Sequence, residues 1–326
     1  MLFRERYEQD LQLIEGSQAW ILVILGAIAL IVFPLLVKGY LIYNFTLFLV
    51  YALVALSLGV LVGLTGQVSL GHAGFLAAGA YTHVILTNNF DLPFLFSIPL
   101  TVLITALLGV VIGLPALRLE GPYLAIATLG FGLAIQQILT NWRYVGASNG
   151  AFIDRPVIFG FDFFGDKEYY YLVLAIVVFV SWMVFNLERS HIGRAFRAVR
   201  DADLAAQMSG IGLARYKTLA FVLSAGIAGL AGALYGPLLS YITPEGFNLL
   251  LSIKFLLMVI VGGLGFIPGA LIGAALVTGL EFVLAGTRSW SQLVFGLIVI
   301  FLMVIEPMGL YGRWLKIKRF WKTWPL

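Results

Sequence analysis

Apolar runs long enough to cross a bilayer recur along this chain of 326 residues and constrain its fold more than any other feature. A transmembrane helix needs about 20 mainly apolar residues. With 61% hydrophobic and 11% charged residues, the chain is also far more apolar than a soluble domain. The sequence therefore predicts an all-α, polytopic membrane protein with about ten transmembrane helices. The predicted spans are 19–37, 41–63, 67–86, 95–117, 121–140, 169–187, 218–239, 249–263, 268–286 and 291–310.

The basic residues indicate how these spans are oriented. If residues 1–18 are cytoplasmic and the spans alternate, most of the 20 lysines and arginines fall on the cytoplasmic side, as the positive-inside rule requires. The exceptions are Lys38, Arg143, Arg155, Lys167, Lys254 and Arg288. We therefore expect a membrane domain over 19–310 and a basic cytoplasmic tail over 311–326. The run 249–263 is short and glycine-rich at its end, so a re-entrant helix is a second interpretation. A re-entrant helix would reverse the membrane orientation of every span that follows it.

Two stretches between the spans are long enough for structure of their own. Residues 141–168 form the predicted external loop, and residues 188–217 form the most charged cytoplasmic loop. The chain has no cysteine, which excludes disulfides and thiolate metal sites. Its N-terminus lacks the pattern of a secretory signal. Because the basic residues flank apolar runs, we expect contact with membrane lipid and none with nucleic acid.

The stretch LTGQVSLGHAGFLAAGAYTHV, residues 64–84, puts polar side chains inside a predicted span. Helical spacing brings Ser69, His72 and His83 onto one face among small residues. Polar groups within a span face protein or water rather than lipid. Two interpretations remain open: a buried, hydrogen-bonded cluster, or the lining of a path for a polar molecule that includes Gln67, Ser69 and His72.

Three patterns that would imply other functions are weak. The pentapeptide GASNG at 146–150 resembles a hydrolase elbow, but it follows an apolar helix rather than a strand, so we expect a turn. The same loop position disfavours an intramembrane serine protease built on Ser148. An ion-coupled secondary transporter would need ionisable groups within the membrane, and Lys254, Glu281 and Glu306 fall near span ends.

No constellation for catalysis or ligation emerges from the rest of the chain. Only three histidines are present, and His191 falls on the opposite side of the membrane from the other two in the predicted topology, so a metal site is disfavoured. No G-x-x-x-x-G-K-[ST] loop occurs, which excludes ATP binding by that route. We therefore expect no catalytic residue, cofactor or metal in this chain.

Small residues at four-residue spacing mark several spans. Such spacing lets helix backbones approach closely in lipid, so it predicts tight helix packing rather than a ligand site. The pattern occurs at Gly59/Gly63, Gly109/Gly113, Gly269/Gly273 and in the series Ser224, Ala228, Gly232 and Gly236.

The cytoplasmic loop contains a predicted amphipathic helix over 193–209 that ends at Gly210 as a cap. One face carries Arg194, Arg197, Arg200 and Asp201, and the other carries Ala195, Val199, Ala202 and Ala206. A basic amphipathic helix can lie on anionic lipid. Alanine is too small to anchor in lipid, so the small face favours docking on another protein.

The chain resembles LIV-type permeases of the M-type branch, the membrane subunits of high-affinity branched-chain amino acid ABC importers. The matching segments are GQVSLGHAGFLAAGAYT (66–82), EGPYLAIATLGFG (120–132), GASNGAFI (146–153), SHIGRAFRAVRDADLAAQMSGI (190–211), YKTLAFVLSAGIAGLAGALYG (216–236), VIVGGLGFIPGALIGAAL (259–276) and EPMGLYG (306–312). They cover most of the chain from Gly66 onward, in family order. Residues 1–40 carry little of the resemblance.

The resemblance implies a type II ABC importer permease fold with both termini cytoplasmic. It implies a related second permease subunit, two cytoplasmic ATPases that bind ATP and Mg, and an extracytoplasmic solute-binding protein in a bacterial or archaeal inner membrane. Similar permeases serve urea, short amides or nucleosides, so these solutes remain alternatives to leucine, isoleucine and valine. The implied coupling helix to the ATPase comprises Arg194, Arg200, Asp201, Asp203, Ala205, Ala206 and Gly210, and Gln67, Ser69 and His72 are candidate path residues.

Overall fold

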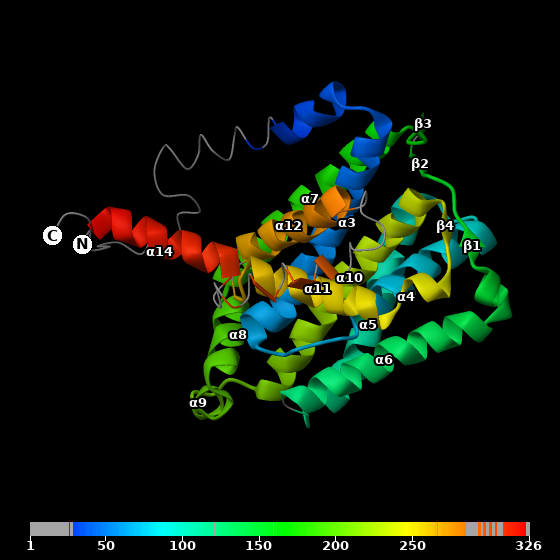
Figure 1. Cartoon of the computed structure of the whole chain (residues 1–326). Coiled ribbons are helices and arrows are strands. Elements are labelled where there is room, and N and C mark those ends of the chain that lie inside the picture. The colour runs from blue at the N-terminus through cyan, green and yellow to red at the C-terminus, as the bar shows by residue number, and fades with distance from the viewer. Residues whose placement is uncertain are drawn as a thin grey trace.

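The computed structural model describes residues 26, 29–119, 121–158, 160–265, 267–284, 293–294, 296–297, 300–301, 304 and 309–323. Helices dominate this part of the chain (Figure 1). The α-helices are α3 (Gly39–Leu58), α4 (His72–Val84), α5 (Phe94–Ala116), α6 (Pro122–Asn141), α7 (Asp166–Arg189), α8 (His191–Asp201), α9 (Asp203–Met208), α10 (Leu213–Leu239), α11 (Leu249–Gly262), α12 (Ile267–Leu284) and α14 (Gly309–Thr323). The π-helical turns η1 (Gly59–Leu64) and η2 (Ile85–Asn89) prolong α3 and α4.

Seven helices of the described residues are long and apolar enough to cross a membrane. They correspond to the predicted runs 41–63, 95–117, 121–140, 169–187, 218–239, 249–263 and 268–286. The run 67–86 differs from the prediction, because its α-helix α4 has only 13 residues and starts at His72. The segment 1–18 lies outside the described residues, and so does about half of each of the predicted spans 19–37 and 291–310. Ten spans are therefore not established.

The short strands lie at one end of the bundle, and the charged helices α8 and α9 lie at the opposite end (Figure 1). At the strand end, β1 (Ala151–Phe152) pairs with β4 (Tyr241–Ile242), and β2 (Val157–Ile158) pairs with β3 (Phe161–Asp162). The predicted external loop is thus structured, as expected. At the other end, α8 and α9 form a bent unit beside the start of α10. The segment Pro244–Gly262, which contains η5 (Pro244–Gly246) and α11, is long and apolar enough to cross a membrane, which favours a full span over a re-entrant helix.

The centre of the bundle is built from α3, α4 and α10, whose small residues let the backbones touch. Gly79 of α4 packs on Gly229 of α10, and an added Cβ at Gly232 would collide with the carbonyl oxygen of Leu76. Gly109 of α5 packs on α10 in the same way. The small-residue spacing therefore predicted the packing correctly. By contrast, α5 and α6 lie on the outside, and few of their side chains are buried.

Candidate functional site

The polar stretch forms a break in the membrane-spanning structure. The π-helical turn after α3 ends at Leu64, Gly66 takes a left-handed φ of 71°, and the chain runs without helix until α4 begins at His72. His72 bonds to Ser224, which lies near the middle of α10. The helix α4 therefore starts inside the bundle rather than at its end. Non-helical backbone at that depth is stable only where protein satisfies its polar groups.

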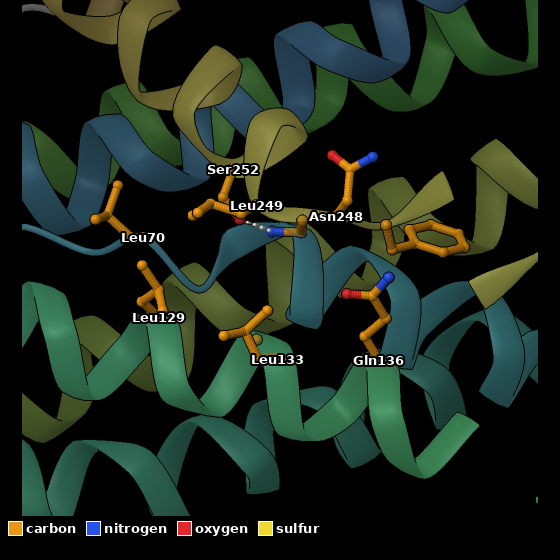
Figure 2. Close-up of a pocket in the computed structure, with 10 residues that line it drawn as sticks. Leu70, Leu129, Leu133, Gln136, Asn248, Leu249 and Ser252 are labelled. Carbon is orange, nitrogen blue, oxygen red and sulfur yellow. Dashed lines mark hydrogen bonds between the residues drawn. The ribbon is translucent and has the colours of Figure 1, made fainter. Parts of the chain in front are cut away.

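Hydroxyl groups from distant helices supply those partners. The backbone N–H of Leu70 donates to Thr128 Oγ1 of α6 at 3.0 Å. The N–H of Ala73 donates to Ser252 Oγ of α11 at 3.0 Å, a contact drawn in Figure 2. Each bond spares a backbone donor the cost of burial without a partner, roughly 1–3 kcal/mol.

His72 forms the centre of a second set of hydrogen bonds. Its Nδ1 lies 3.0 Å from Ser69 Oγ, and its Nε2 lies 2.8 Å from Ser224 Oγ. Ser224 Oγ in turn donates to the carbonyl oxygen of Ser57 in α3 at 2.9 Å. The side chains of Ser69, His72 and Ser224 are fully buried. The cluster thus joins the break to α3, α4 and α10.

A single neutral tautomer satisfies this cluster. Because the Ser224 hydroxyl donates to Ser57, it must accept a hydrogen bond from Nε2–H of His72. Nδ1 is then an acceptor, and the Ser69 hydroxyl donates to it. We assign the tautomer from the network, as is usual for histidine. These hydrogen bonds require no charge on the His72 imidazole, and a neutral ring suits a position among apolar helices.

The candidate path residues therefore differ from the helical face that the spacing predicted. Gln67 and Ser69 lie in the break, before the first residue of α4, because Gly66 and Gly71 interrupt the helix. Gln67 is 5% exposed and its Oε1 lies 3.4 Å from Thr65 Oγ1. All three candidates are enclosed within the chain, so the geometry matches the hydrogen-bonded cluster. A role in a path stays a prediction.

Sequence reasoning missed the partners of the break. Thr128, Ser224 and Ser252 are buried hydroxyls that bond to the break or to His72. The only available signal was a hydroxyl residue within an apolar helix, which is common and usually bonds to its own helix. Nothing local indicated that these three would converge on residues 69–73.

The predicted single helix over 193–209 is wrong in one respect, because the structure breaks it at Ala202. Ala202 is extended, with φ −163° and ψ 106°, and separates α8 from α9. The change of direction lets Asp203 form an ion pair with Lys217 of α10 and buries Ala206 to 3% exposure. A straight helix would carry both residues away from α10.

Gly210 ends α9 as predicted. Its φ is 81°, its N–H donates to the Gln207 carbonyl, and the N–H of Ile211 donates to the Ala206 carbonyl. These two bonds define a Schellman motif, which favours glycine at this position.

Two arginines of the predicted coupling helix contact the ends of other helices. Arg194 donates to the carbonyl of Arg189, the last residue of α7, at 3.0 Å. Arg200 Nη1 donates to the carbonyl of Gly63 at 2.6 Å. A cation at a helix C-terminus is favoured by the free carbonyls and the helix dipole.

The Arg200 side chain lies where two breaks meet. Gly66 and Gly265 both have left-handed φ, and an added Cβ at either would press on the Arg200 side chain. Gly265 belongs to the turn between α11 and α12. Arg200 therefore fastens α8 both to the break before α4 and to this turn.

The surface that α9 leaves outward is apolar rather than basic. Leu204 is 72% exposed and Met208 is 85% exposed, and Asp201 and Ala205 are exposed beside them. A groove of about 600 Å³ lies next to Leu204, between α9, the start of α10 and Leu117. The exposed Leu204 and Met208 were not among the predicted coupling residues.

The remaining candidates lie apart from the break. GASNG forms a 3₁₀ turn with left-handed φ at Gly146 and Gly150, which confirms the predicted turn. Lys254 pairs with Glu281 near the strand end and its Nζ lies 4.4 Å from the centre of the Tyr51 ring. Glu306 lies outside the described residues.

A bundle of apolar spans, an embedded helix break held by side-chain hydroxyls, and a charged helical unit fastened to that break define a multi-pass membrane protein. The chain belongs to the family described as the permease component of the branched-chain amino acid transport system, whose profile matches residues 40–303.

Individual relatives agree with that family. The chain is 34% identical to the high-affinity branched-chain amino acid transport system permease protein LivM of Salmonella typhimurium, over 81% of this chain and 68% of the relative. It is 26% identical to the corresponding protein BraD of Pseudomonas aeruginosa, over 81% and 92%. It is also 26% identical to the autoinducer 2 import system permease protein LsrC of Salmonella paratyphi B, over 71% and 74%. No solved structure matches the chain.

Proposed function

We propose that this chain is the permease subunit of an ABC importer that moves leucine, isoleucine and valine across a bacterial or archaeal inner membrane. The relatives named for branched-chain amino acid transport support the solute class. The observation that carries the mechanism is the Arg200 contact, because it links a helical unit outside the spans to the broken helix inside them. A force applied to α8 and α9 would reach residues 63–72 directly.

The proposed partner subunits are inferred from the missing phosphate-binding loop and from the surfaces that the chain exposes. The sequence has no phosphate-binding loop, so we assign ATP and Mg to two partner ATPases at the α8 end, which is then cytoplasmic. A related second permease would complete the path, and a solute-binding protein would dock at the strand end. The exposed α5 and α6 would face lipid or the second permease.

We infer that the ATPase docks on α9 rather than on the basic face of α8. Leu204 and Met208 offer an apolar surface of the kind that anchors interfaces, and the adjoining groove leaves room for partner side chains. Asp201 and Ala205 lie on the same outward side. Arg194, Arg200, Asp203, Ala206 and Gly210 would instead hold the docking unit on the membrane helices.

Other solutes and another class of transporter are the alternatives to this function. The autoinducer 2 importer relative indicates that the family is not restricted to amino acids. Urea, short amides and nucleosides are the alternatives. The Lys254–Glu281 pair keeps an ion-coupled transporter as a candidate of another class, although each charge already has its partner.

The decisive experiment is uptake by proteoliposomes that contain the chain with its sister permease, ATPases and binding protein. We expect accumulation of labelled leucine only with internal ATP, and competition by isoleucine and valine but not by urea or nucleosides. Accumulation driven by a proton or sodium gradient without ATP would refute the importer.

The coupling mechanism has its own test in the same system. Arg200→Gln removes the bond to the Gly63 carbonyl, so ATP hydrolysis should continue while leucine uptake falls at least about tenfold. The matched control is Arg197→Gln, on the same helix, whose contact with Glu188 is exposed and long at 3.5 Å. Equal uptake by the two variants would contradict the proposed linkage.

A further inference from the structure

A narrow crevice runs beside the break between α4, α6 and α11 (Figure 2). Its lining residues are Leu70, Ala73, Leu129, Gly132, Leu133, Gln136, Phe247, Asn248, Leu249 and Ser252. The free volume is about 10 Å³, roughly the space of one water molecule, so the crevice is closed in this structure. It extends from Leu70 and Leu129 toward Gln136 and Asn248, and Asn248 directly precedes α11 (Figure 2).

The walls combine apolar and polar groups in a fixed order. Leu70 and Leu129 lie at one end of the crevice, Leu133, Leu249 and Ser252 lie between the ends, and Gln136 and Asn248 lie at the other end (Figure 2). A small molecule with a branched aliphatic part and a polar or charged part would match both kinds of wall.

Two of the polar groups have unused hydrogen-bonding capacity. The side-chain amide of Gln136 makes no hydrogen bond to any described residue, and Figure 2 shows it directed from α6 toward α11. The Ser252 hydroxyl is 2% exposed and accepts from Ala73 N–H, but within the described ranges it has no acceptor for its own hydrogen. Unpaired polar groups are costly in a membrane span, which makes them candidates for a functional role.

Asn248 differs, because its amide is already held in place. Its Oδ1 accepts from the N–H of Leu251 at 3.1 Å, and its Nδ2 donates to the carbonyl of Glu245 at 3.3 Å. Asn248 therefore serves as a fixed wall, and Gln136 and Ser252 remain as the groups free to bind.

We propose that this crevice is a solute-contact subsite, in which Gln136 and Ser252 bind the charged groups of an amino acid and the leucines that line the crevice contact its branched side chain. The inference rests on the proposed function and assigns that function to residues other than Gln67, Ser69 and His72. Opening requires α6 to move away from α4 and α11. The helix α6 is the least buried of the seven spans, and it meets α4 where Gly132 faces Gly71 and Gly74. Its movement would release the bond between Leu70 and Thr128 and the ring contact between Phe75 and Phe131.

Neighbouring glutamines provide a matched pair for the test. Gln136 lines the crevice, whereas Gln137 is exposed on another side of the same helix. In the reconstituted complex, Gln136→Leu should lower the rate of labelled leucine uptake at saturating binding protein by at least about tenfold, the expected loss of one hydrogen bond to a charged group. ATP hydrolysis stimulated by the loaded binding protein should persist. Gln137→Leu should transport at the normal rate.

Thiol labelling in this cysteine-free chain gives a readout that does not depend on transport rate. Modification of a Gln136→Cys variant should slow when leucine is present during turnover, while modification of Gln137→Cys should not change. Normal uptake by Gln136→Leu, equal loss in both leucine variants, or labelling indifferent to leucine would each overturn the subsite alone. An unsubstituted complex that accumulates no leucine would overturn the proposed function and this inference with it.

Discussion

At the scale of single residues, His72 shows how a histidine is accommodated inside an apolar bundle. Its two ring nitrogens are paired with Ser69 and Ser224, and neither side chain is exposed. The imidazole replaces packing contacts with directed bonds, so it specifies how the break meets α10. A fully satisfied buried network of this kind restricts the arrangement of the helices around it.

We expect His72→Leu to destabilise the chain by about 1–3 kcal/mol, because the buried hydroxyl of Ser69 loses its acceptor and that of Ser224 loses its donor. The thermal unfolding midpoint in detergent measures this effect. Ser57→Ala is the control, since the Ser57 hydroxyl donates to the carbonyl of Val54 within its own helix and the Ser57 carbonyl remains. Unchanged stability combined with lost uptake would instead favour a path role for His72.

At the scale of elements, glycine decides how closely α4 and α10 approach. A Cβ at Gly232 would collide with backbone atoms of α4, which cannot move aside as a flexible side chain could. We expect Gly232→Ala to separate the two helices and to prevent assembly of a stable permease, as measured by size-exclusion chromatography and protease resistance. The control Gly279→Ala adds a methyl group in open space on α12 and should assemble normally. Similar behaviour of both variants would contradict the close packing.

The unit formed by α8 and α9 makes a second prediction at this scale. Leu204→Asp places a charge in the proposed docking surface, so the ATPases should no longer copurify although the permease keeps its stability. Ala206→Trp should do the reverse, because Ala206 is buried in its own chain and overpacking costs about 1–3 kcal/mol. Loss of copurification by Ala206→Trp at unchanged stability would restore the alanine face as the docking surface.

At the scale of the whole molecule, the two ends of the bundle differ in chemistry. The strand end carries the structured loop 141–168, and the other end carries α8, α9 and the start of α14, which packs on Gly263. The basic residues concentrate at the second end, which predicts that it is cytoplasmic.

Cysteine labelling in intact cells tests this orientation. A membrane-impermeant thiol reagent should modify Ser148→Cys, in the exposed turn at the strand end, and should modify Ala205→Cys only after the membrane is permeabilised. Both positions are exposed, so a difference in labelling reports the side of the membrane rather than burial. Modification of Ala205→Cys in intact cells would reverse the topology.

Local sequence was sufficient for features that depend on neighbouring residues. The seven spans were predicted within a few residues, because the length of an apolar run alone determines whether a helix can cross a bilayer. The cap at Gly210 was likewise predictable, since a left-handed position strongly favours glycine. The sequence also indicated that residues 64–84 are unusual, because polar side chains are rare in a span.

The tertiary structure decided where that unusual stretch is broken and what holds it. The helix begins at His72 because hydroxyls from α6 and α11 satisfy the backbone of residues 70–73, and these partners lie 58 and 179 residues away in the chain. The bend at Ala202 brings Asp203 to Lys217, and Arg200 donates to the carbonyl of Gly63. Such contacts form only when distant helices pack together, so no periodicity within one segment reports them. The residues and their helical tendencies were set by the sequence, whereas the partner of each polar group was determined by the packing of the bundle.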